Sequence, residues 1–84
     1  MFTKKEMKCI DKGAFTVLAS DDWNVTVQSL ETGDRWHILN TEWPQEKASV
    51  IYRQDRDRGM VLVGGARSLD HAIAKIMVLE AAVF

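Results

Sequence analysis

The sequence has one cysteine, one proline and no long apolar run. The lone Cys9 cannot form a disulfide within the chain, which favours a reducing, cytoplasmic location. Uninterrupted apolar runs such as 60–63 and 76–79 reach four residues, far short of the ~20 that cross a bilayer. Residues 1–12 also lack the apolar stretch of ~7–15 residues that a signal peptide needs. We therefore expect neither a membrane span nor secretion by that route.

An excess of charge is also missing, because 11 Lys and Arg stand against 12 Asp and Glu, for a net charge of −1. The chain therefore lacks the overall positive charge that is typical of nucleic-acid-binding proteins. Low net charge with 46% hydrophobic residues indicates a folded chain, not a disordered one. The length of 84 residues allows one domain, which we expect to span residues 1–84.

Residues 23–30 alternate between apolar and polar side chains, which is typical of a half-buried strand. Gly33 follows in a polar turn, after which a second β-prone run begins. These features predict a β-hairpin over residues 23–39. We expect Trp23 and Trp36 to face each other across it.

Further β-prone runs flank this hairpin. Residues 7–10 are predicted to form a short edge strand, and 14–19 a second strand. Residues 40–47 hold the only proline and are predicted to form a crossing loop. Residues 48–53 and 60–63 then predict a second hairpin with a charged tip.

The last segment changes to helical periodicity. Ser68 is a favourable N-cap, and Asp70 in the first turn complements the helix dipole. At 100° per residue, a helix over 69–84 gathers one apolar arc from Leu69, Ala72, Ile73, Ile76, Leu79 and Val83. Glu80 intrudes on this arc and needs either a polar partner or an exit to solvent.

Together these elements predict an α+β domain. It consists of a mostly antiparallel sheet of five or six short strands, with two clear hairpins and one C-terminal amphipathic helix packed on it. A helix is ~10 Å wide and strands lie ~4.8 Å apart, so one helix shields only two or three strands. The other strands must curl into a partial barrel, face water or meet a partner, and any apolar surface left over would serve self-association or partner binding.

The residues that could carry chemistry do not form a recognised pattern. Cys9, His37 and His71 are all far apart in sequence, whereas structural zinc ligands usually occur in pairs ~2–5 residues apart. No G-x-S-x-G motif is present, and Cys9 falls in a predicted edge strand. We expect no catalytic residue, no metal and no cofactor, and hence no enzyme.

The preferred function is that of a small non-catalytic interaction protein, such as an accessory, inhibitor or immunity-type factor. It would bind a protein partner, itself, or both. Trp43 lies in the predicted crossing loop, where a tryptophan either covers the sheet or anchors a partner. The predicted partner-binding residues are Trp43, Tyr52, Val78 and Phe84.

Two alternatives belong to other classes. The segment 53–67 is rich in arginine next to an aromatic ring, which suits nucleic acid, although Asp55 and Asp57 offset the charge. The residues of this alternative are Tyr52, Arg53, Arg56, Arg58 and Arg67. The third hypothesis is a small anion or ligand bound where a strand meets the helix, at Gly64, Gly65, Arg67 and Ser68.

Overall fold

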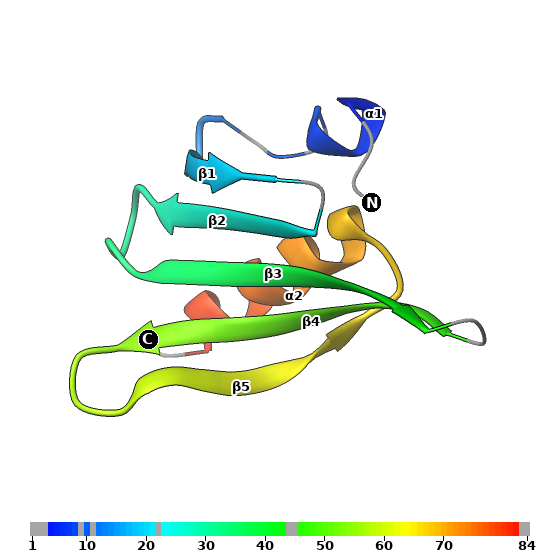
Figure 1. Ribbon diagram of the computed structural model, residues 1–84. Helices are drawn as coiled ribbons and strands as arrows, with labels where there is room; N and C mark the ends of the chain where they lie inside the picture. The colour runs from blue at the N-terminus through cyan, green and yellow to red at the C-terminus, as the bar shows by residue number, and fades with distance from the viewer. Residues whose placement is uncertain (1–3, 9, 11, 22, 44–45, 83–84) are drawn as a thin grey trace.

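The computed structural model describes residues 4–8, 10, 12–21, 23–43 and 46–82 (Figure 1). Within these ranges the elements follow in the order α1 (Lys4–Met7), β1 (Phe15–Ser20), β2 (Asn24–Ser29), β3 (Arg35–Trp43), β4 (Glu46–Asp55), β5 (Gly59–Ala66) and α2 (Leu69–Ala81). The strands form one antiparallel sheet in the order β1-β2-β3-β4-β5, and α2 packs on one face of it. The predicted α+β class is confirmed, with five strands in the described residues.

The first predicted hairpin is confirmed as β2 and β3, and Gly33 in its turn has a φ of 77°, which suits glycine. Its register places Trp36 directly opposite Val27. Trp23 lies before β2, where its carbonyl accepts a 2.7 Å hydrogen bond from the N–H of Asn40. The expectation that Trp23 and Trp36 face each other is therefore wrong, because the turn sets a register that keeps them apart.

The second hairpin is also confirmed, as β4 and β5. Its tip at residues 56–58 leads into Gly59, whose φ is 72°. A β-bulge interrupts the ladder, because Leu62 pairs with Tyr52 while Gly64 pairs with Ile51, so that Val63 is the additional residue.

Two predicted elements are wrong. The segment 7–10 is not an edge strand; the chain instead forms the short helix α1 and a bend, and Met7 and Ile10 pack against the core. The segment 40–47 is not a crossing loop. β3 continues to Trp43 and β4 begins at Glu46, because extended backbone on both sides of the proline can complete a ladder.

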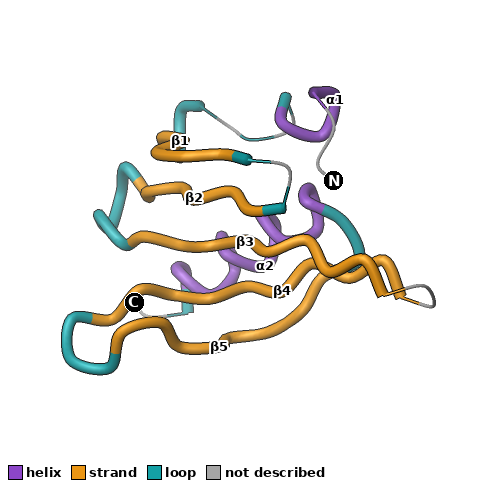
Figure 2. Tube along the Cα trace, in the orientation of Figure 1, coloured by secondary structure: helices purple, strands orange, loops and turns teal. Residues whose placement is uncertain are grey.

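The core lies between α2 and one face of the sheet. Alternate residues of the central strands point to this face and are fully or almost fully buried, namely Val25, Val27, Trp36, Ile38 and Ile51. The predicted helical arc meets them with Leu69, Ala72, Ile73 and Ile76. In Figure 2, α2 crosses diagonally behind the middle of the sheet, and β5 extends beyond it.

The helix contacts β3, β4 and β5 and leaves the opposite face of the sheet uncovered, which we call the open face. On the inner face, α2 and β5 do not close completely against each other, and a hollow remains between them. No helix of the described residues is long and apolar enough to span a membrane.

Candidate functional site

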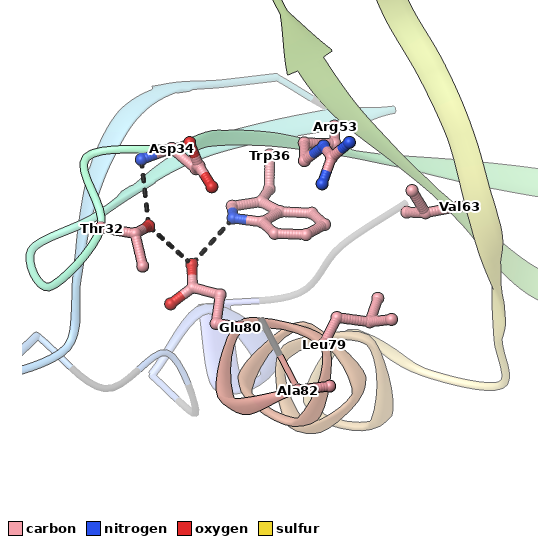
Figure 3. A pocket seen from close by; sticks show the side chains of 8 residues that line it. All are labelled: Thr32, Asp34, Trp36, Arg53, Val63, Leu79, Glu80 and Ala82. Carbon is pink, nitrogen blue, oxygen red and sulfur yellow. Dashed lines mark hydrogen bonds between the residues drawn. The ribbon is translucent and has the colours of Figure 1, made fainter. Parts of the chain in front are cut away.

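Glu80 is the one acidic residue among the buried polar side chains of the described chain, with 8% of its surface exposed. Three neutral groups donate hydrogen bonds to its carboxylate: Ser29 Oγ at 2.9 Å, Trp36 Nε1 at 2.9 Å and Thr32 Oγ1 at 3.3 Å. Figure 3 shows the bonds from Trp36 and Thr32. Of the two alternatives expected for Glu80, the structure shows the polar partner, which β2, β3 and the turn between them provide. These bonds fix the end of α2 to the sheet.

A pocket of about 340 Å³ opens beside this cluster. Trp36 and Glu80 form one wall, Val63 and Leu79 form the apolar side, and Arg53 lies across from Glu80 (Figure 3). No ion pair joins Arg53 to Glu80 in the described part of the chain. The remaining lining residues are Thr32, Asp34 and Ala82.

A second, larger hollow of about 450 Å³ lies farther along the same side of α2. It shares Val63 and Leu79 with the Glu80 pocket, so the two are adjacent. We call it the α2–β5 hollow, lined by Val63 and Gly64 of β5 and by Ala74, Val78 and Leu79 of α2. His71 and Lys75 also contribute to its lining, and Ile51 forms its floor against the core.

The hollow exists partly because Gly64 has no side chain. A Cβ built at this position would meet no atom within 4 Å, and its φ lies outside the left-handed region that favours glycine. Neither backbone geometry nor crowding therefore requires glycine here. The absent side chain leaves open space between β5 and α2.

Exposed aliphatic side chains surround the hollow. Val78 is 69% exposed and Leu79, which the helical periodicity placed on the apolar arc, is 38% exposed. On the other side of β5, Met60 and Leu62 are more than half exposed on the open face. Sequence reasoning identified Val78 but missed Leu62 and Leu79, because their exposure depends on where α2 crosses the sheet.

The open face has a polar centre. His37 is hydrogen-bonded through Nδ1 to the hydroxyl of Thr26 at 2.9 Å, and its Nε2 donates to Oε1 of Gln54 at 3.2 Å. Tyr52 is the cross-strand neighbour of His37, and Leu62 follows Tyr52 on the next strand. The apolar character of this face thus increases toward β5.

The predicted partner-binding residues lie in different places. Val78 borders the α2–β5 hollow, whereas Tyr52 is on the open face. The backbone of Trp43 ends β3, but its side chain is outside the described part, as is Phe84. Among the described residues, the structure does not bring Tyr52 and Val78 together.

The arginines of the nucleic-acid alternative are also dispersed. Arg53 points to the inner face, opposite to its neighbour Tyr52. Arg56 and Arg58 lie at the hairpin tip, whereas Arg67 follows the other end of β5. Because β5 is eight residues long, Arg67 lies about 25 Å from the tip. At the tip, the backbone N–H of Asp57 donates to Asp55 and lowers the pKa of that carboxyl below its ordinary value of 3.8.

Three of the four residues of the anion hypothesis are hydrogen-bonded to side chains or backbone of α2. Gly64 and Gly65 lie within β5, not in a loop, and the carbonyl of Gly65 accepts a hydrogen bond from Lys75 Nζ. The N–H of Arg67 donates to Nδ1 of His71, and the N–H of His71 donates to Ser68 Oγ, both at 3.2 Å. Three donors at this junction are thus already used within the chain.

The residues proposed for metal or nucleophilic chemistry are not assembled in the part that the structure describes. His37 and His71 lie on different elements, and the described residues contain no group of three or more metal-binding side chains. Cys9 lies outside the described residues.

Comparisons of this chain with models of protein families, with curated proteins and with solved structures find no match.

Proposed function

We propose that this chain is a small non-catalytic interaction protein that binds a protein partner, or a second copy of itself, through the α2–β5 hollow. The observation that supports it most is Val78, which lies in the last turn of α2, is 69% exposed and borders a hollow of about 450 Å³. A concave apolar site with exposed aliphatic side chains at its rim is typical of a docking surface.

The energetics support this proposal. Complete burial of one aliphatic side chain stabilises a complex by about 1.5–3 kcal/mol. Val78, Leu79 and Val63 lie together, so one apolar side chain of a partner would contact all three. Part of this gain offsets the loss of translational and rotational freedom on association.

The non-catalytic part of the proposal is supported by the state of the reactive groups. Glu80 accepts from three donors, and both ring nitrogens of His37 are bound to side chains. Nδ1 of His71 accepts from the backbone of Arg67. These groups are occupied by structural hydrogen bonds instead of facing a common reacting position.

Two substitutions test the α2–β5 hollow, one by adding a charge and the other by adding apolar volume. Val78→Glu places a charge at the rim, and Gly64→Leu fills the hollow from a position where a Cβ meets no atom within 4 Å. Leu18→Glu is the matched control, since Leu18 is 43% exposed on β1 at the far edge of the sheet. Each tagged variant is used to capture proteins from extracts of the native cell, followed by mass spectrometry.

We expect the wild type and Leu18→Glu to capture the same partner, and both hollow variants to lose it while their melting temperatures stay close to that of the wild type. Equal capture by all four proteins would show that the hollow is not the docking surface. Loss of capture by Leu18→Glu alone would place the interface at β1.

A further inference from the structure

β5 forms an outer edge of the sheet and has no charged residue. It pairs with β4 on one side only, and its sequence is Gly-Met-Val-Leu-Val-Gly-Gly-Ala. Edge strands that stay unpaired usually carry charge or proline that discourages pairing with another chain. β5 has neither. Charge occurs only beyond its ends, at the hairpin tip and at Arg67.

Both sides of this edge are apolar. Leu62 and Met60 are exposed on the open face, and the α2–β5 hollow lies beneath the strand on the inner face. A strand added to β5 would therefore be flanked by apolar side chains above and below. A second copy brings the same two surfaces, so the contact would be complementary to itself.

The spacing of the charges beyond the two ends of β5 favours one register for such a pair. When two identical strands pair antiparallel about a two-fold axis, one residue lies opposite its own copy. With Leu62 on the axis, Leu62 and Met60 of both copies meet on the open face, whereas Gly64, which the bulge turns to the inner face, leaves space beside the hollow. Asp57 and Arg67 lie five residues before and after Leu62, so each Asp57 would lie near Arg67 of the other copy, and both are exposed. Two symmetric ion pairs would result.

We propose that β5 pairs antiparallel with β5 of a second copy about a two-fold axis at Leu62, forming a homodimer in which the two hollows join into one apolar groove. This inference rests on the proposed function, because it names the occupant of the same side of the molecule. The net charge of −1 means that two copies repel each other only weakly.

Two features limit the backbone contribution to this contact. The bulge at Val63 twists the edge, and Lys75 Nζ already occupies the carbonyl of Gly65. The ladder between copies is therefore short, and burial of apolar side chains must supply most of the affinity.

Sedimentation velocity over a concentration series tests the dimer. We expect the wild type to reach a dimer mass at high micromolar concentration. Leu62→Lys places two like charges on the axis and should leave a monomer, whereas Leu18→Lys on β1 should still dimerise. A wild type that stays monomeric throughout, or a dimer that Leu62→Lys leaves intact, would overturn the proposal.

Charge reversal tests the register. Asp57→Arg and Arg67→Asp should each weaken dimerisation about three- to tenfold, because two exposed ion pairs become like-charge contacts. The double variant D57R/R67D should return to the wild-type affinity, and additive weakening would overturn this register. A monomeric wild type whose Val78→Glu variant still loses a captured partner would refute the homodimer alone and leave the proposed function intact.

Discussion

At the scale of single residues, the environment of Glu80 could be predicted from the sequence only in part. Its position on the apolar arc of a helix predicts that it needs either a polar partner or an exit to solvent, and does not decide between them. The partners could not be predicted, because Ser29 and Trp36 are 51 and 44 residues away in the chain. They meet Glu80 only because α2 is placed diagonally across the sheet.

Replacing Glu80 by Ala tests the importance of this cluster. Trp36 Nε1 and Ser29 Oγ would lose their acceptor in a buried position, which costs about 1–3 kcal/mol per unsatisfied group. Because the adjacent pocket admits water, we expect a total loss of about 1–3 kcal/mol in the free energy of unfolding, measured by urea denaturation.

The control for this experiment is Glu31→Ala, which removes an exposed carboxylate from the neighbouring turn. It should change stability by less than about 0.5 kcal/mol. If Glu80→Ala were equally mild, the carboxylate would not be the buried acceptor that links α2 to the sheet.

At the scale of elements, periodicity predicted the helix and both hairpins because these depend on neighbouring residues. The failures at 7–10 and 40–47 have a different origin. An extended preference before proline fits a loop and a strand equally well, and only the pairing of Thr41 with Ala48 across the sheet decides between them. For 7–10, a β-prone composition was outweighed by the packing of Met7 and Ile10 against the core.

The start of α2 depends on Ser68, whose Oγ accepts from the N–H of His71 at 3.2 Å. Ser68→Ala leaves that N–H without its cap, and we expect a loss of about 1 kcal/mol, seen as a decrease of about 4–8 °C in melting temperature. Ser20→Ala, at the exposed end of β1, serves as the matched control. An unchanged melting temperature in Ser68→Ala would mean that solvent replaces the cap without cost.

At the scale of the whole molecule, comparing the width of a helix with the spacing of strands correctly predicted that α2 cannot cover the entire sheet. It could not predict which surface stays open. That depends on the strand order and on the direction in which α2 crosses, and these leave the hollow between α2 and β5. The interaction residues predicted from sequence were accordingly distributed over two faces.

This one-sided architecture makes a prediction for amide hydrogen exchange. β3 lies in the middle of the sheet and pairs with a strand on each side, whereas β1 and β5 each lack a neighbour on one side. In dilute solution we expect the central amides of β3 to exchange most slowly and those of β5 markedly faster, measured by mass spectrometry of peptic fragments. Slower exchange in β5 than in β3 under these conditions would contradict the assignment of β5 as an open edge.

The simple strand order has a consequence for the speed of folding. Each strand pairs with its neighbour in sequence, so the meander forms through short loop closures, which favour fast folding. The helix closes on the sheet through more distant contacts, such as that of Glu80 with Ser29, 51 residues apart. Until those contacts form, the inner face is bare, and contact with a chaperone or another unfolded chain competes with completion of the fold.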